Sequence, residues 1–500
     1  MKTMELFLMA ALALIFAACS NGDNDIQDTI RQPVKAEGIT ITATLAPKTG
    51  GAATRAVSEG TGEIVAQWAV DEHIAILYDK GGTQVADARI TSVDASGAAT
   101  ITFSVEAGTA DNTACTLVYP LSAAKADHSG VKAYADLLAT QDGGLDADLD
   151  VRVGAGKILT TTPSLNVTTQ PAAQYSIFKF TVQDISAKAI TPTEFKVSDS
   201  EGNVITTVRP SATAFYAALP ALSASTYWFS ATAAGKPYIA KATVGTATTA
   251  GNYYQTTVKM ATLGDLMGQD GKFYADAAAI KSASTTAIGV IAYLGNDATT
   301  EAIANGGGHG LVMCLKNAAR EKDAAWSKNQ ILEFGEDAKV TDVNGLKRTT
   351  NVSGYTNTKT LAGKTDAATK YKAAYNAKNY SGLTAPTGTT GWFLPSAQQW
   401  VKMIEGLGGL TDGAPVFERF DSDRKGATAW ENAIKKAGDG NYDSLTKGYD
   451  YYWSSSEYSA DCAVTLIVCT ETQYNYGFYW SDDGKPSENS NFFVRPILAF

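Results

Sequence analysis

The most regular hydrophobic pattern in the chain lies near its N-terminal end, between Gly38 and Leu45. Apolar residues at every second position (Ile39, Ile41, Ala43 and Leu45) alternate there with three threonines. A period of two places one set of side chains on each face of an extended segment. The pattern therefore predicts a β-strand with one buried and one exposed face.

Similar short apolar runs, separated by Gly- and Asp-rich turns, continue for more than two hundred residues. The first group is expected at Glu63–Trp68, Ile74–Tyr78, Ala88–Val93, Thr100–Val105 and Cys115–Tyr119. A second group, from Ser164 to Met260, is expected at Ile177–Val182, Glu194–Ser198, Ala214–Leu219, Tyr227–Ala231 and Tyr253–Met260. Short strands at regular spacing predict two tandem antiparallel β-sandwich domains, over residues 38–160 and 161–262.

From about Gly271 helical patterns appear between the strands. Ser396 with Gln399, and Thr428 with Glu431, have the spacing of helix-starting capping boxes. A third helix is expected over Asp366–Lys378, and strands are expected at Ala287–Tyr293, Gly310–Cys314, Ala463–Cys469 and Phe493–Ala499. Residues 271–500 therefore read as an α+β domain, and the whole chain as a mainly β protein.

Composition narrows the possible functions. The 500 residues are 45% hydrophobic and 18% charged, as in globular proteins, and the formal net charge is −10. An acidic chain lacks the basic excess that nucleic-acid binding requires, so no nucleic acid partner is expected. His73, His128 and His309 have no metal-ligand spacing, and neither a metal nor another cofactor is predicted.

The first residues have the pattern of a secretion signal. An apolar run from Leu6 to Ala18 follows Lys2 and is too short to span a bilayer as a mature helix. Its end, Phe16-Ala17-Ala18-Cys19, resembles a bacterial lipobox. The resemblance implies a signal peptide over 1–18, lipidation of Cys19, a flexible tether over 19–37 and a lipoprotein of the outer membrane. An ordinary signal peptide with an incidental cysteine is the alternative.

Cys462 and Cys469 are the remaining cysteines close enough in sequence to consider as a pair. The apolar run between them reads as a strand, and seven residues of extended chain span roughly 23 Å. A disulfide needs Cα atoms within about 7 Å. A continuous strand therefore excludes that disulfide.

Four short segments within 38–260 resemble the fimbrillin family, the lipoprotein pilins of anaerobic gut and oral bacteria. They are Trp68–Ile74, Gln174–Phe180, Phe215–Pro220 and Ala250–Tyr254. The resemblance implies that an Arg-directed protease removes the first strand, and that a strand of another pilin subunit replaces it. Arg55, in a loop of small residues after that strand, is the expected cleavage site. The alternative is an ordinary loop arginine on a protein that keeps its lipid anchor.

Three segments of the last domain resemble the bacterial C-type-lectin-like fold, in the subgroup of fibrobacter major paralogous domains and formylglycine-generating enzymes. They are Gly391–Trp400, Tyr452–Tyr458 and Val494–Phe500. The resemblance implies a helix after a core strand at the first segment and the start of the final sheet at the second.

The stretch between Trp453 and Val494 mixes aromatic and small polar residues, as antibody binding loops do. It also resembles the variable tail of lectin-like proteins that retroelements diversify. By that analogy the ligand-contacting positions are Ser459, Asp461, Thr465, Thr470, Tyr474, Tyr476, Tyr479 and Trp480. A tyrosine-rich sheet with a purely structural role is the alternative.

Motifs for catalysis are weak. Formylglycine-generating relatives use a cysteine pair, which the spacing of Cys462 and Cys469 disfavours. Trp480-Ser481-Asp482 matches only part of a calcium-dependent sugar site. The favoured function is therefore a non-enzymatic surface adhesin, expected at a pilus tip, with a host, microbial or glycan ligand. A surface enzyme of formylglycine-generating type and a lipid-anchored glycan-capture protein outside any pilus are the alternatives.

Overall fold

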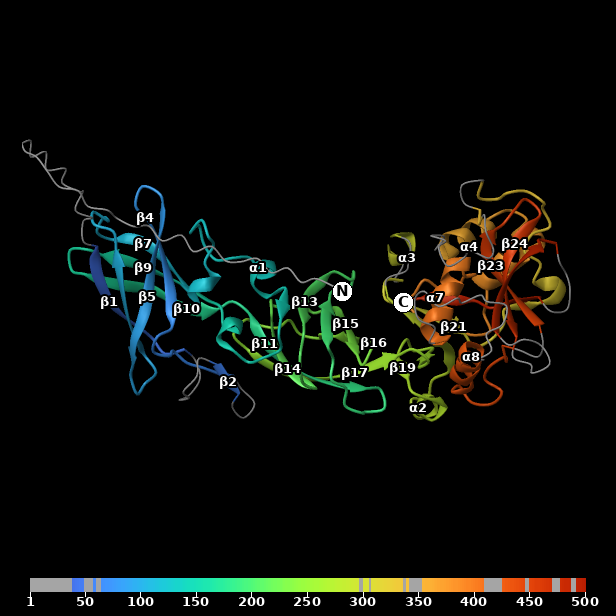
Figure 1. Ribbon diagram of the computed structural model, residues 1–500, viewed down its shortest axis with the longest axis horizontal. Helices are drawn as coiled ribbons and strands as arrows, with labels where there is room; N and C mark the ends of the chain where they lie inside the picture. Colours follow the sequence, from blue (N-terminus) through green and yellow to red (C-terminus); the bar gives the residue numbers. More distant parts are fainter. Residues whose placement is uncertain are drawn as a thin grey trace, which may run out of the picture.

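Three folded units lie in a row along the long axis of the molecule (Figure 1). The computed structural model describes residues 38–48, 57–59, 64–295, 300–304, 307–335, 339–340, 353–408, 425–445, 449–469, 477–486 and 492–500. The mainly β fold class with an α+β C-terminal part is confirmed. Cys19 and Arg55 lie outside the described residues.

The first unit is a sheet that closes on itself as a barrel. In spatial order its strands are β1 (Ile39–Leu45), β10 (Ser164–Ala173), β9 (Arg152–Leu159), β7 (Thr113–Tyr119), β4 (His73–Asp79), β5 (Thr83–Val93) and β6 (Ala99–Val105). A hairpin of β2 (Val57–Glu59) and β3 (Ile64–Ala66) accompanies the barrel. Inward-facing residues of all seven strands form one apolar core.

The boundary between the first two units lies after β10 and not before it. Residue 161 was expected to begin the second domain, but β10 pairs with β9 along its length and with β1 at Thr42. The expected boundary at 160/161 is therefore wrong, because it separates two hydrogen-bonded strands of one barrel. Apart from the two-residue strand β8 (Thr140–Gln141), the strands of the second sheet begin at Ser176.

The second unit is one continuous sheet folded around its own core. Its strands, in spatial order, are β14 (Ala214–Leu219), β11 (Ser176–Asp184), β17 (Tyr253–Thr262), β16 (Lys236–Thr243), β15 (Thr226–Ala233), β12 (Glu194–Ser198), β13 (Val204–Val208) and β8 (Thr140–Gln141). Most pairs are antiparallel, but β11 runs parallel to β17.

Strand β8 joins the first two units, because in sequence it lies between β7 and β9 of the barrel, yet it pairs with β13 of the second sheet. The buried Gln141 Nε2 donates to the Thr206 hydroxyl and the Ala218 carbonyl, both at 2.9 Å. Tyr134, in the helix α1 (Tyr134–Leu138), donates to the same carbonyl at 2.8 Å. The first unit is therefore fixed to the second by buried hydrogen bonds.

The C-terminal unit contains two five-stranded sheets. The first consists of β19 (Phe273–Tyr274), β18 (Leu266–Gly268), β20 (Ala287–Leu294), β21 (Gly310–Cys314) and β27 (Ile497–Ala499). The second consists of β22 (Ala319–Arg320), β26 (Phe492–Val494), β23 (Tyr449–Glu457), β24 (Cys462–Cys469) and β25 (Gly477–Gly484). The helices are α2 (Ala277–Ser282), α3 (Thr300–Ala304), α4 (Gly354–Ala362), α5 (Ala367–Lys370), α6 (Lys372–Lys378), α7 (Ala397–Gly408) and α8 (Lys425–Lys435). A short 3₁₀ turn occupies Glu321–Asp323 in this unit, and two others lie between β7 and β9, at Leu121–Ala123 and Ala147–Leu149.

The first predicted capping box is confirmed. The backbone nitrogen of Gln399 donates to Ser396 Oγ at 3.3 Å, and the backbone nitrogen of Ser396 donates to Gln399 Oε1 at 2.9 Å. The second box is wrong, because Thr428 lies inside α8, which begins at Lys425. The helix expected over 366–378 is divided at Tyr371, whose φ of −125° and ψ of 51° are not helical.

The last predicted strand is also divided. Residues 493–499 were expected to form one strand, but β26 belongs to the second sheet and β27 to the first. Arg495 and Pro496 lie at the crossing, and Pro496 has no N–H to donate to a ladder. The buried Arg495 guanidinium instead donates to the carbonyls of Cys314 and Asp443, both at 3.0 Å. The final residues therefore join the two sheets.

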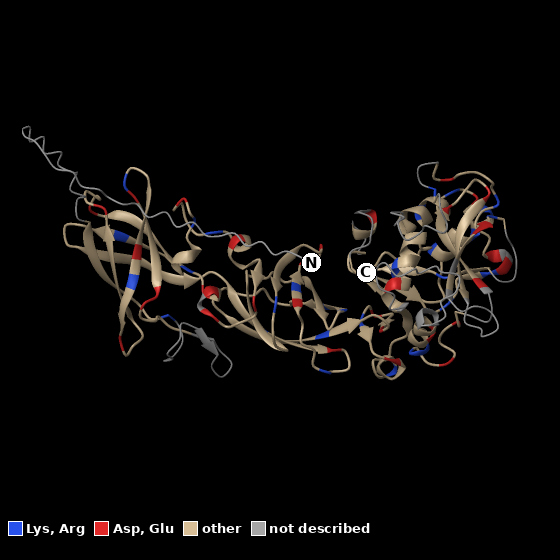
Figure 2. Ribbon diagram, in the orientation of Figure 1, with Lys and Arg blue, Asp and Glu red and all other residues tan. Residues whose placement is uncertain are grey.

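The middle and C-terminal units share an apolar cluster. Trp228 and Ile239 of the middle unit pack with Met267, Val312 and Phe500 of the C-terminal unit. Positively and negatively charged residues are interspersed along the ribbon of all three units (Figure 2). None of the described helices is long and apolar enough to cross a bilayer.

Candidate functional site

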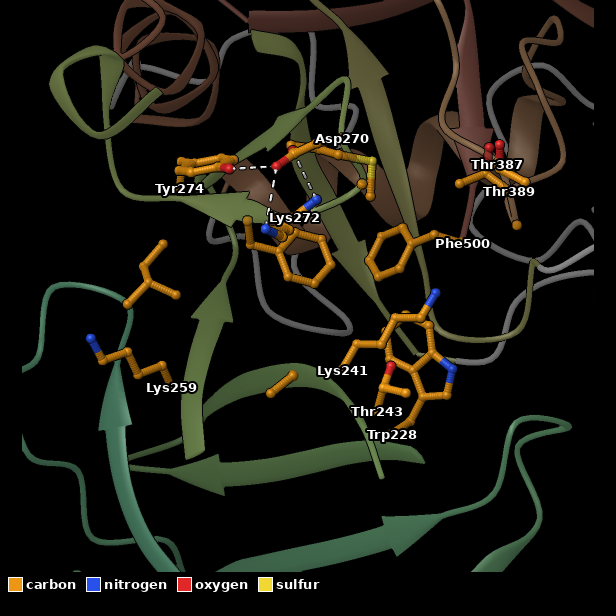
Figure 3. A pocket seen from close by; sticks show the side chains of 16 residues that line it. Trp228, Lys241, Thr243, Lys259, Asp270, Lys272, Tyr274, Thr387, Thr389 and Phe500 are labelled. Atoms are coloured by element: carbon orange, nitrogen blue, oxygen red, sulfur yellow. Dashed lines mark hydrogen bonds and ion pairs between the residues drawn. The ribbon is translucent and has the colours of Figure 1, made fainter. Parts of the chain in front are cut away.

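A cavity of about 570 Å³ lies where the middle and C-terminal units meet (Figure 3). The middle unit supplies side chains from β15, β16 and β17, and the C-terminal unit supplies the turn from Met267 to Tyr274 and the loop at 387–389. Trp228, Phe273 and Phe500 form aromatic parts of its lining. Its volume falls in the range typical of small-molecule sites.

The polar rim of this junction cavity is mainly cationic. Lys241, Lys259 and Lys272 are exposed and line it. Asp270 is the one carboxylate among the described residues of the lining. It already accepts a hydrogen bond from the Tyr274 hydroxyl at 2.7 Å and lies 3.9 Å from Lys272 Nζ. Burial, together with the Asp270 carboxylate, raises the pKa of Tyr274 to about 12, which keeps it a donor. The cavity therefore offers positive charge, hydroxyl groups and aromatic surface.

His309 connects the two units beside this cavity. Its ring stacks on Trp228 with a centroid distance of 3.9 Å and an interplanar angle of 26°. Burial and the nearby Lys241 ammonium lower the pKa of His309 to about 4. A neutral imidazole is therefore part of the contact near pH 7. A second hollow of about 480 Å³ lies on the His309 side of the junction, against β12 and β13.

The junction cavity has no counterpart in the sequence pattern. Its lining comes from segments more than two hundred residues apart, and none of them has a recognised motif. A local signal was present only in the Asp270-Gly271-Lys272 turn, which resembles many surface turns. The cavity depends on how two domains dock, which a linear pattern does not encode.

The described tail positions differ in their exposure. Asp461 is exposed at the turn between β23 and β24, next to Ser459, whose hydroxyl accepts hydrogen bonds from the backbone nitrogens of Asp461 and Cys462. Thr465 has no exposed surface, and its hydroxyl donates to Asp483. Trp480 packs partly buried against Val464 and helix α7.

These positions correct one part of the predicted ligand surface. Thr465 does not display its side chain, because that side chain is buried and its hydroxyl is bonded to Asp483 on the neighbouring strand β25. Tyr479 belongs to β25, and its side chain is not among those that the structure describes. Thr470, Tyr474 and Tyr476 lie outside the described residues.

The Trp-Ser-Ser-Ser-Glu segment within 452–458 is buried. Ser454, Ser455, Ser456 and Glu457 are at most 1% exposed. The Glu457 carboxylate accepts hydrogen bonds from the backbone nitrogens of Glu333 and Phe334 at 3.0 Å, and from Lys485 Nζ at 2.5 Å. The segment therefore fixes the fold of the C-terminal unit.

The described residues contain no group of three or more His, Cys, Asp or Glu that could hold a metal ion. Cys462 is a free thiol at the start of the continuous strand β24, as the strand interpretation required. Cys115 and Cys314 are free and buried, and burial raises the pKa of both thiols to about 12. A raised pKa leaves these thiols protonated and poorly nucleophilic.

Strand β1 has two unequal neighbours in the barrel. It forms seven antiparallel residue pairs with β6, from Ile39–Val105 to Leu45–Ala99, but a single parallel pair with β10. Its inward residues Ile41 and Leu45 have no exposed surface. The inward face of the strand is thus buried at the place where the barrel closes, and its threonine face is exposed.

A β-barrel, a folded sheet and an α+β unit, joined through buried contacts, define a modular β-rich protein with a junctional cavity. No family model and no curated protein sequence matches the chain. Among solved structures, a fimbrial protein from Bacteroides ovatus is 15% identical over 93% of this chain and 100% of its own, with a TM-score of 0.34. A fimbrial assembly protein from Parabacteroides distasonis is 11% identical over 44% of this chain and 90% of its own, with a TM-score of 0.27. Both likenesses are weak.

Proposed function

We propose that this protein is a non-enzymatic adhesin at the surface of the bacterium, delivered as an outer-membrane lipoprotein through Cys19 and built into a pilus by strand exchange. In this proposal cleavage after Arg55 releases β1, and a strand of another subunit takes its place. In this proposal the C-terminal unit stands at the tip and carries the ligand.

The observation that supports assembly best is the arrangement of β1. Its loss would open a groove between β6 and β10 and expose the apolar faces that Ile41 and Leu45 now cover. Burying one such side chain is worth about 1.5–3 kcal/mol, so the open groove favours a replacement strand. Main-chain hydrogen bonds to β6 would supply affinity, and alternating side chains would supply register.

Mass spectrometry of the protein in purified pili tests this assembly. We expect a mature chain that begins at Ala56 in wild-type pili and an Arg55→Ala variant that stays unincorporated on the membrane. Arg89→Ala is the matched control, since Arg89 lies on β5 with an exposed side chain. Pili containing chains that still begin at Cys19 would contradict the proposal.

For the ligand we propose an anionic sugar held in the junction cavity. The lysines at its rim would pair with a carboxylate or sulfate group, and the aromatic lining would contact the apolar face of a sugar ring. The exposed Ser459–Asp461 turn and the predicted tail positions remain a second candidate surface.

A glycan array carrying carboxylated, sulfated and neutral sugars tests the cavity. We expect binding to anionic sugars that falls at least tenfold in Lys241→Met and is unchanged in Lys188→Met, an exposed lysine outside the cavity. Binding that survives Lys241→Met but is lost when Tyr474 and Tyr476 are replaced would assign the ligand to the tail instead. An activity abolished by Cys462→Ser would favour the enzyme of formylglycine-generating type, and an Arg55→Ala variant with normal surface function would favour a glycan-capture lipoprotein.

A further inference from the structure

Lys48, just after β1, buries its ammonium group inside the barrel. The residue lies three positions beyond Leu45, and its side chain has no exposed surface. Its Nζ is 3.1 Å from Asp150 Oδ2 and 3.7 Å from Glu72 Oε2. A buried lysine is rare unless its charge is compensated.

Two aromatic rings complete the surroundings of this ammonium. Nζ lies 4.3 Å from the centroid of the Trp68 ring and 3.7 Å from that of Tyr119. The two rings are nearly perpendicular, at 87°, and 5.3 Å apart. Nζ makes no hydrogen bond of good geometry, so charge attraction and the ring faces hold it. Trp68, Glu72, Tyr119 and Asp150 are named here the cation socket.

The walls of the cation socket are held in place without Lys48. The Tyr119 hydroxyl donates to Glu72 Oε1 at 2.7 Å, and Arg152 Nε donates to both oxygens of Asp150 at 2.7 and 2.9 Å. All of these wall residues follow position 55 in the chain. Cleavage after Arg55 would therefore remove the ammonium and leave its socket in the barrel.

The charge balance of the site depends on Lys48. With it, two cations (Lys48 and Arg152) face two carboxylates (Glu72 and Asp150). Without it, one guanidinium remains for two acids in a largely buried site, and Arg152 is already directed at Asp150. An unpaired charge in such a place is strongly destabilising. An apolar strand alone would fill the groove and leave this charge unpaired.

We propose that the cation socket selects the strand that replaces β1, by requiring a lysine three positions after the last inward-facing residue of that strand. The partner is a subunit whose donor strand runs antiparallel to β6, as β1 does, with apolar residues at every second position. The inference rests on the strand exchange proposed above. The lysine also fixes the register of the replacement strand against β6, because a shift of one residue would take the ammonium away from the socket.

Peptide exchange on the full-length chain tests the inference. The folded protein is cut after Arg55 with an arginine-specific protease and mixed with a labelled, amidated peptide of residues 38–51. A second peptide carries Lys48→Met, which keeps the length of the side chain and removes its charge. A third carries Thr44→Met, a control at an exposed position of β1. The protein is identical in all three titrations, so its folding does not affect the comparison.

We expect the wild-type and Thr44→Met peptides to bind with similar affinity, and the Lys48→Met peptide to bind at least tenfold more weakly. A cut Glu72→Gln protein should show a smaller difference between the lysine and methionine peptides. Equal uptake of all three peptides by the cut wild-type protein would overturn the socket while leaving strand exchange intact. If no peptide enters, strand exchange fails, and the socket inference is overturned with it.

Discussion

The contact between His309 and Trp228 should make the junction of the middle and C-terminal units sensitive to acid. His309 is neutral in the packed junction because burial and Lys241 lower its pKa to about 4. An exposed histidine titrates near 6.5. When the junction opens, the imidazole therefore becomes a stronger base.

The sign of the effect follows from these two pKa values. Between pH 6.5 and about 4 the open state binds a proton that the packed state does not bind, so acid favours opening. The contribution of neutral His309 to stability is complete above pH 6.5, falls as the pH is lowered, and is lost below about pH 4. The gap between the two pKa values corresponds to about 3 kcal/mol, with a slope of at most about 1.4 kcal/mol per pH unit.

Urea unfolding at pH 7.5, 6.5, 5.5 and 4.5 measures this loss. His309→Phe keeps an aromatic ring against Trp228 and cannot bind a proton, so its junction should lose up to about 3 kcal/mol less than wild type over that range. Acid effects from carboxylates are common to both proteins and cancel in the difference. His73→Phe, in the barrel, is the control and should follow wild type. The same pH dependence in wild type and His309→Phe would refute the reasoning.

Two further substitutions test the packing of the C-terminal unit by urea unfolding. Glu457→Gln leaves the buried Lys485 ammonium without its counter-charge and should cost about 3–5 kcal/mol. Lys359→Met, at an exposed ion pair, should cost much less. Equal losses of stability in the two variants would contradict the role of burial. Gly289→Ala would place a Cβ 2.6 Å from the Met313 carbonyl oxygen on the adjacent strand β21. We therefore expect the free energy of unfolding to fall by about 1–3 kcal/mol. An unchanged unfolding midpoint would show that β20 and β21 separate without cost.

Local patterns predicted the elements whose cause is local. The alternation around Ile41 identified β1, and the Ser396–Gln399 spacing identified the start of α7 because both capping hydrogen bonds form between those two residues. Thr428 had the same spacing with Glu431 but did not begin its helix. Helical geometry already starts at Lys425, so the spacing alone does not locate a terminus.

Features that depend on distant contacts could not be predicted in this way. Residues 493–499 read as one apolar run, yet the buried Arg495 takes the chain from one sheet to the other because its acceptors are Cys314 and Asp443. Strand β10 belongs to the first barrel because it pairs with β9 on one side and with β1 on the other. The same limit applies to the junction cavity, whose aromatic and cationic residues meet only when two units dock.

The buried position of Trp453–Glu457 changes what a motif can say about function. This segment is the most distinctive sequence motif in the chain, but its side chains make internal contacts. The Ser454 hydroxyl donates to the Val464 carbonyl at 2.8 Å, and Glu457 is paired with Lys485. These two side chains are thus bonded inside the fold and are not offered to a ligand at the surface. Resemblance at such a segment is evidence about architecture. Evidence about binding partners comes instead from sites that combine several charged side chains with space for a ligand or a replacement strand. The junction cavity and the cation socket are two such sites in this molecule, and both lie where one part of the chain meets another.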